Sequence, residues 1–177
     1  QINSFYYERM LVSREKQQMR LDENKKELPR QPIDLIKDPY VLEFLGLKDF
    51  SNFSEKELEQ ALIDKLQVFM LELGKGFAFV ARQFRISTET KHFYVDLVFY
   101  NRLLRCYVLI DLKIGKLTHQ DLGQMQMYVN YFDRFVKMET ENDTIGIVLC
   151  KRKHEALVEI TLPKDANIHA REYQLYL

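Results

Sequence analysis

Three charged residues in neighbouring apolar segments have the types and the spacing that phosphodiester hydrolysis requires. Asp96 lies within one apolar run, and Asp111 and Lys113 lie two residues apart at the end of the next. Carboxylate oxygens can hold Mg²⁺ while leaving positions for water and phosphate, and a nearby cation can position the attacking water and offset developing charge. The alternative interpretation is structural, with an Asp96–Lys113 ion pair inside a sheet and Asp111 satisfied by a backbone amide.

The alternation of side chains along a strand predicts how these residues are placed. In the first run, Asp96 and Val98 are expected on one face and Val95 on the other. In the second run, Asp111 and Lys113 share a face and lie about 7 Å apart along the backbone. A carboxylate between large apolar neighbours is costly unless it is paired or bound to a cation. Two carboxylates on adjacent strands, with a lysine beside the second, are therefore a candidate metal site.

The elements that must position these residues follow one order along the chain. Two capping boxes, at Ser54–Glu57 and Thr118–Asp121, each open a helix whose apolar residues recur with the helical period. Alternating or continuous apolar runs between turn residues predict the strands. The expected order is a helix at 54–74, strands at 76–86, 91–100 and 103–112, a helix at 118–137, a strand at 144–150, a short helix at 154–160 and a last strand at 173–177.

The beginning of the chain reads as a connection to another domain. A charged helix is expected at 4–20, a proline-containing linker at 22–32 and a short helix at 38–46. The chain starts at Gln1, without an initiator Met and without the layout of a signal peptide. We therefore interpret it as part of a longer protein, with one domain at 33–177.

Composition excludes several classes of protein. The 177 residues are 46% hydrophobic and 29% charged, enough to build and cover a core, so disordered and collagen-like chains are excluded. No apolar run approaches the roughly 18 residues that predict a membrane span. The two cysteines, Cys106 and Cys150, lie in apolar runs without metal-ligand spacing. Buried, reduced thiols of this kind indicate a cytoplasmic protein.

The balanced total charge hides an asymmetry between two segments. Residues 33–72 carry four lysines against nine acids, a net charge of −5, whereas residues 76–120 carry seven basic residues against three acids, a net charge of +4. A basic segment that keeps two acids inside strands is compatible with an anion-binding face around a metal site. Solvated sheet edges also collect lysine and arginine, and this alternative stays open.

Further residues join the pattern on either side of the strands. Glu59 lies in the preceding helix, and Gln124 and Tyr128 lie four residues apart in the following helix, on a face beside its apolar stripe. Together with the order of elements, these residues resemble the PD-(D/E)XK nuclease superfamily, and more narrowly the C-terminal nuclease domain of the bacterial YhcG family. The segments that carry the resemblance, which covers the chain from about Asp38 to its end, are Phe93–Tyr100, Val108–Gly115 and Gly123–Tyr128.

The resemblance implies a restriction-endonuclease-like αβββαβ core, an α/β fold with a mixed central sheet flanked by helices. It implies that Asp96 is the principal metal ligand and that Asp111 is the second, helped by the backbone carbonyl of Leu112. Lys113 takes the lysine position of the motif. Glu59 matches a helix glutamate that contacts metal through water or holds a second ion.

The resemblance also extends to residues at the edge of the site. Gln124, with Tyr128, matches a helix motif that some superfamily members place there. Two positions depart from the pattern, because Val95 stands where the motif has proline and Asp111 stands where glutamate is common. Neither departure removes a required group. The candidate substrate contacts are Tyr128, Lys116, Arg82 and Arg85.

The function implied is a metal-dependent nuclease that uses Mg²⁺ or Mn²⁺ in restriction, recombination, repair or defence against mobile elements. DNA is favoured over RNA as the partner, although no residue separates the two sugars. Homodimers are common among such nucleases, and a covalently linked N-terminal domain would precede this chain. The rival interpretation is a catalytically silent module that binds nucleic acid or assembles with a partner on the same fold.

Overall fold

The computed structural model describes residues 32–36 and 54–172. The helices expected at 4–20 and 38–46, the strand expected at 173–177 and all of the linker except Pro32 lie outside the described residues. In chain order, the elements are η1 (Pro32–Leu35), α3 (Glu55–Asp64), α4 (Leu66–Leu73), β1 (Phe77–Ser87), β2 (His92–Asn101), β3 (Cys106–Leu112), α5 (His119–Tyr131), the π-helical segment η2 (Phe132–Val136), β4 (Ile145–Cys150), α6 (Glu155–Thr161) and β5 (Ile168–Glu172).

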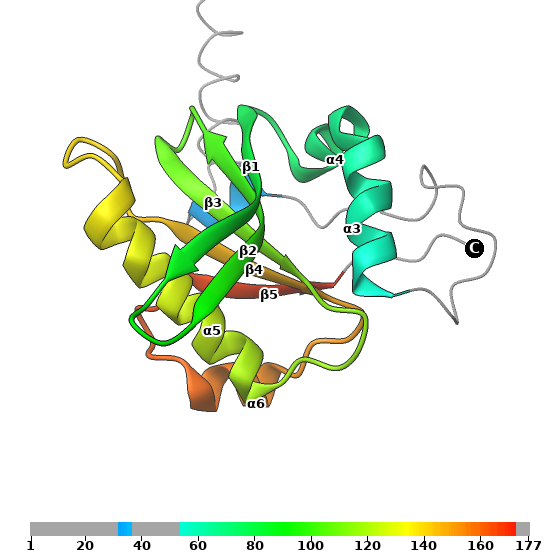
Figure 1. Ribbon diagram of the computed structural model, residues 1–177, viewed down its shortest axis with the longest axis vertical. Coiled ribbons are helices and arrows are strands. Elements are labelled where there is room, and N and C mark those ends of the chain that lie inside the picture. The colour runs from blue at the N-terminus through cyan, green and yellow to red at the C-terminus, as the bar shows by residue number, and fades with distance from the viewer. Residues whose placement is uncertain (1–31, 37–53, 173–177) are drawn as a thin grey trace, which may run out of the picture. The chain divides into compact units, whose positions relative to one another are not determined.

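The strands form one mixed sheet in the order β1-β2-β3-β4-β5. The first three strands pair antiparallel, and β3, β4 and β5 pair parallel. Helices α3 and α4 lie on one side of this sheet and α5 lies on the other (Figure 1). The predicted α/β fold, with its mixed sheet flanked by helices, is confirmed. None of the described helices has both the length and the apolar composition that crossing a membrane requires.

Both predicted capping boxes are present and fix where α3 and α5 begin. Ser54 Oγ accepts a hydrogen bond from the backbone N–H of Glu57 at 3.2 Å, and the Glu57 carboxylate accepts one from the backbone N–H of Ser54 at 2.6 Å. Thr118 and Asp121 make the same reciprocal pair at 3.2 and 2.9 Å. Each box satisfies two backbone N–H groups that a helix start otherwise leaves without partners.

The predicted helix at 54–74 is two helices. Lys65 leaves the helical region of backbone conformation, with φ −116° and ψ 31°, and separates α3 from α4. Apolar side chains remain buried on both sides of this break, with Leu62 before it and Phe69 after it. The apolar pattern continues through the interruption, and for this reason periodicity alone predicted one helix.

The turn between β2 and β3 is longer than predicted, and β3 begins at Cys106 rather than at 103. The side chain of Asn101 accepts hydrogen bonds from the backbone N–H groups of Leu103 and Leu104, which folds these residues back as a turn. Arg105 then adopts a left-handed conformation, with φ 53°. The side-chain hydrogen bonds of Asn101 therefore replace strand pairing at these positions.

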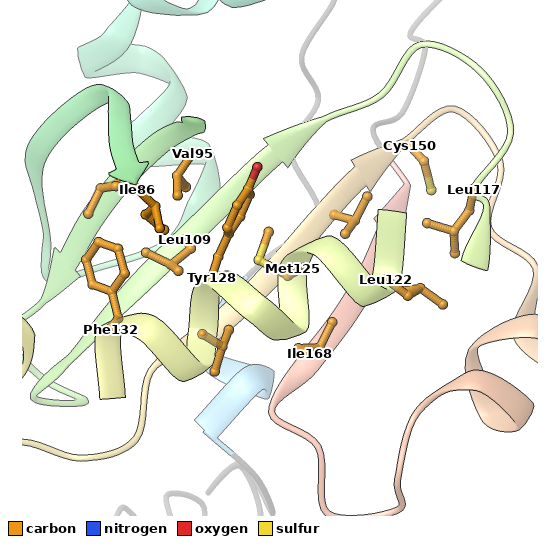
Figure 2. Packing of buried hydrophobic residues seen from close by; sticks show 13 residues of the cluster. Ile86, Val95, Leu109, Leu117, Leu122, Met125, Tyr128, Phe132, Cys150 and Ile168 are labelled. Carbon is orange, nitrogen blue, oxygen red and sulfur yellow. The ribbon is translucent and has the colours of Figure 1, made fainter. Parts of the chain in front are cut away.

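A cluster of buried apolar residues lies between α5 and the sheet. Met125, Tyr128 and Phe132 reach from α5 and the following residue toward the strands (Figure 2). Gly146 in β4 allows the helix to approach closely, because a Cβ atom there would lie 2.7 Å from Met125 Cγ and 2.8 Å from Val129 Cγ2. Helix α5, which carries part of the predicted site, is therefore fixed directly against the centre of the sheet.

Two glycine substitutions are expected to change stability in opposite directions. Gly146→Ala should lower the free energy of unfolding by about 1–3 kcal/mol, because the added methyl group overlaps packed side chains. Gly123→Ala in α5 should raise it by about 1 kcal/mol, because alanine favours the helix and no atom lies within 4 Å of the new Cβ. Urea denaturation of both variants measures the two effects. Equal effects on the two variants would contradict this account of the α5–β4 contact.

Candidate active site

Asp96 lies where β2 separates from β3. Residues 97–101 of β2 pair with both β1 and β3, whereas residues 92–95 pair with β1 alone. At this fork, Asp96 Oδ2 accepts a hydrogen bond from the backbone N–H of Leu112 at 2.8 Å, and the backbone N–H of Asp96 donates to Asp111 Oδ1 at 3.3 Å. Each aspartate thus bonds a backbone amide of the other strand, and the two carboxylates are held next to each other.

The side chains of β2 change face at this fork. Val95 and Val98 both belong to the apolar cluster against α5. The prediction that Val98 and Asp96 share one face, with Val95 on the other, is therefore wrong. Opposite Asp96 in β1, between the pairs Arg82–Leu97 and Phe84–Val95, Gln83 has φ 50°. A left-handed residue interrupts the two-residue repeat of a strand, so both strands are irregular at this point.

The two carboxylates lie in an environment that disfavours negative charge. Asp111 is buried, with 4% of its surface exposed. Burial, followed by repulsion from Asp96, raises the pKa of Asp111 to about 7. Burial also raises the pKa of Asp96, and the hydrogen bonds from Leu112 and Gln83 only partly offset it. A positive charge close to Asp96 and Asp111 would therefore stabilise their ionised forms.

Lys113 is the nearest lysine in sequence, and its ammonium group pairs with Asp121 at 3.4 Å. Burial lowers the pKa of Lys113, but the acids Glu55, Asp121 and Asp111 outweigh it, and the pKa lies above its usual range. Lys113 therefore keeps its proton. The alternative interpretation predicted an Asp96–Lys113 ion pair and a backbone amide bonded to Asp111. The bond to the backbone amide is present, but Lys113 pairs with Asp121 rather than with Asp96.

Glu59 is brought to the same site from α3. Its side chain is buried, and its oxygens accept hydrogen bonds from Arg82 Nε at 2.7 Å and from Gln83 Nε2 at 2.6 Å. The same Gln83 nitrogen lies 3.0 Å from Asp96 Oδ1. A single side-chain amide therefore separates Glu59 from Asp96, and Arg82 joins the site as the ion-pair partner of Glu59.

The two candidate site residues of α5, Gln124 and Tyr128, differ in their surroundings. Gln124 is half-buried, whereas Tyr128 is buried within the apolar cluster. The Tyr128 hydroxyl donates a hydrogen bond to the backbone carbonyl of Tyr94 at 3.1 Å, and burial and the two aspartates raise its pKa. The prediction that Tyr128 lies beside the apolar stripe is wrong, since Tyr128 is part of it. Its burial leaves no surface for a direct substrate contact.

Arg85 and Lys116, the two remaining candidates for substrate contact, interact with residues outside the carboxylate pair. Arg85 is exposed on the β1–β2 hairpin, where its guanidinium lies 2.9 Å from the His92 ring. Lys116 is exposed in the segment after β3, and its backbone bridges to Arg152 after β4. The segments beyond the carboxyl ends of these two parallel strands therefore run side by side and both carry basic residues.

The donor set fits a hard divalent cation. Across residues 32–36 and 54–172, no group of three or more His, Cys, Asp or Glu side chains is arranged to hold a metal ion. Mg²⁺ is commonly bound through one or two carboxylates, with water and substrate phosphate completing its coordination. Asp96 and Asp111 provide such a pair, and burial together with repulsion from Asp96 raises the pKa of Asp111. A cation would relieve the repulsion between them.

Comparison with known proteins assigns the chain to a family. A family model described as the YhcG PDDEXK nuclease domain matches residues 33–177. The chain belongs to this family. YhcG of Escherichia coli (strain K12) is 44% identical over 178 residues, which cover 100% of this chain and 47% of that protein. The chain thus spans about half the length of this curated relative.

Two solved structures are similar to parts of this YhcG-family chain. A repair endonuclease from Pyrococcus abyssi has a TM-score of 0.46 at 16% identity, over 73% of this chain and 50% of the other. EndoMS in a complex with dsDNA has a TM-score of 0.47 at 14% identity, over 74% of this chain and 50% of the other.

Two residues of this YhcG-family site were not found by sequence reasoning. Gln83 bridges Glu59 and Asp96, and Asp121 holds Lys113. Asp121 was predicted as a capping residue, and its second contact follows from that position. Gln83 lies between an arginine and a phenylalanine in an unremarkable strand, and nothing in the sequence indicates its left-handed backbone.

Asp111→Asn is expected to stabilise the metal-free chain, because it removes a buried charge whose pKa is raised from 3.8 to about 7. In EDTA at pH 8, the free energy of unfolding should rise by about 2 kcal/mol, which corresponds to roughly 4–8 °C in Tm. The wild-type chain should gain part of this stability as the pH falls from about 7 toward 4, because the folded chain then binds a proton that the unfolded chain does not.

The matched control is Asp165→Asn, which changes an exposed aspartate in the loop before β5. This variant should unfold at the wild-type temperature. Thermal unfolding followed by circular dichroism gives both values. A lower Tm for Asp111→Asn than for wild type in EDTA would contradict the account of the carboxylate pair.

Proposed function

We propose that this domain is a metal-dependent nuclease that hydrolyses phosphodiester bonds in DNA, using Mg²⁺ or Mn²⁺. The observation that carries the proposal is the pair of adjacent carboxylates at the fork of β2 and β3, with the charged Lys113 on the same segment as Asp111. Membership of the YhcG PDDEXK nuclease domain family supports it.

The site residues would act in distinct ways. Asp96 and Asp111 would hold the cation, with the carbonyl of Leu112 as a further ligand. The cation, when bound, supplies charge stabilisation to the phosphate and the leaving oxygen in the transition state. Lys113 is protonated because its pKa is raised, so its positively charged ammonium group would orient the attacking water. Glu59 would act through water or hold a second ion.

Several features support a nucleic acid, such as DNA, as the substrate. Residues 76–120, which contain Asp96, Asp111 and Lys113, carry a net charge of +4, from seven basic residues against three acids, and a basic surface attracts a polyanion. Arg85 and Lys116 are exposed and available to phosphates. Gln124 would contact substrate at the site edge. A cytoplasmic location, a homodimer and a linked N-terminal domain that contributes specificity belong to the same proposal.

The test is metal-dependent cleavage by the 177-residue chain. Labelled linear, single-stranded and four-way-junction DNA, and matching RNA, are incubated with the chain in Mg²⁺, Mn²⁺ or EDTA. We expect cutting of DNA in either metal and none in EDTA, and the preferred substrate narrows the pathway. Cutting in EDTA would contradict metal dependence, and preferential cutting of RNA would contradict the DNA assignment.

An absence of cutting under every condition would favour the silent module, unless cleavage requires the proposed N-terminal domain. A metal titration separates these cases. A ligand that binds only the folded state stabilises a protein, and does so more the tighter it binds, so a competent site should raise Tm in Mg²⁺ or Mn²⁺ relative to EDTA. A chain that neither cuts nor gains stability from metal would overturn the proposal.

A further inference from the structure

The side chain of Gln83 connects two carboxylates that come from different elements. Its amide nitrogen lies 2.6 Å from Glu59 Oε2 in α3 and 3.0 Å from Asp96 Oδ1 in β2. A primary amide nitrogen carries two hydrogens, one for each of these acceptors. Because both partners are carboxylates, the nitrogen rather than the oxygen of the amide must face them.

The remaining oxygens of these carboxylates are also held by fixed groups. Arg82 Nε bonds Glu59 Oε1 at 2.7 Å, and the backbone N–H of Leu112 bonds Asp96 Oδ2 at 2.8 Å. Each carboxylate is therefore held at both oxygens. Gln83 provides the link that sets the position of one carboxylate relative to the other.

The backbone of β1 is adapted to this link. In a regular strand, Arg82 and Gln83 would point to opposite faces, but both side chains contact Glu59. The left-handed conformation of Gln83, with φ 50°, makes this convergence possible. Such a conformation is unfavourable for a residue other than glycine and persists where surrounding contacts impose it, often at functional sites.

We propose that Gln83 is a positioning residue of the candidate site, which holds Asp96 and Glu59 at the spacing that a divalent cation requires. The inference rests on the proposed function. A carboxylate oxygen has more than one acceptor position, so Asp96 Oδ1 can keep its bond from Gln83 and still bind a cation. Partners that orient metal ligands in this way typically contribute 10–100-fold to metal affinity.

The test compares metal affinity in matched variants of the 177-residue chain. Gln83→Leu removes the amide at similar volume, and Gln83→Gly removes it while accepting the left-handed backbone. Gln60→Leu is the control, because Gln60 is an exposed neighbour of Glu59 whose side-chain amide bonds Asp64 on the same helix. We expect Mn²⁺ to bind about tenfold more weakly to both Gln83 variants and with wild-type affinity to Gln60→Leu, by calorimetric titration below the Tm of each.

The titration separates positioning from a purely structural role, since lost packing lowers Tm but leaves the affinity of the folded chain unchanged. Wild-type Mn²⁺ affinity in both Gln83 variants would overturn the inference and leave the proposed function standing. Absence of Mn²⁺ binding by the unmodified chain would overturn the proposed function, and the role of Gln83 with it.

Discussion

Asp96→Asn is expected to reduce the rate of metal-dependent DNA cleavage by about a thousandfold or more, since charge stabilisation at a reacting centre contributes effects of this order. The variant keeps the size of the side chain and an acceptor for the backbone N–H of Leu112, but it loses the charge that binds a cation. Asp96 is buried enough for its pKa to be raised, so removal of its charge should not unfold the domain.

Single-turnover cleavage of the preferred DNA measures this effect, and calorimetric titration with Mn²⁺ measures the accompanying loss of metal affinity. Asp165→Asn provides a matched change at an exposed position and should cleave at the wild-type rate. Circular dichroism confirms that each variant is folded. Cleavage by Asp96→Asn at the wild-type rate would remove Asp96 from the catalytic site.

Lys113→Ala is expected to lower cleavage by about a hundredfold while leaving Mn²⁺ affinity close to that of the wild-type chain. The contrast with Asp96→Asn follows from the different roles of the two residues. Lys113 carries a proton at neutral pH because the acids around it raise its pKa, and an ammonium group does not bind a metal ion. In the proposed mechanism, Lys113 would orient water and offset charge during the reaction.

The control for Lys113 is Lys164→Ala, which makes the same change in the exposed loop after α6. This variant should retain the wild-type rate. If Lys113→Ala lost metal affinity as completely as Asp96→Asn, the separation of roles would be wrong. If it kept both affinity and rate, the lysine would have no part in the reaction.

Much of the fold could be predicted because local signals agree with it. The capping boxes at Ser54 and Thr118 mark helix starts through hydrogen bonds between residues three apart, and such contacts are readable in a sequence. The proximity of Asp96 and Asp111 followed from the order of strands. The placement of Glu59 near them required the resemblance, because no local rule brings a helix residue to a strand.

Other features depend on contacts that no local pattern encodes. Tyr128 occupies the core because α5 lies close against the sheet. Gly146 in β4 allows this close approach. The change of face at Asp96 lies opposite Gln83, thirteen residues earlier, which has a left-handed backbone and bonds Asp96. A left-handed residue inside a strand has no sequence signal when it is not glycine, asparagine or aspartate.

The carboxylate of Asp121 divides its oxygens between two tasks. Oδ2 accepts from the backbone N–H of Thr118 at the start of α5, and Oδ1 pairs with Lys113. The first turn of a helix opens more readily than its centre. Fraying of this turn would release Lys113 without unfolding the sheet, so the rate of reaction should follow the closed population of a single helical turn, which amide hydrogen exchange at Asp121 and Leu122 would report.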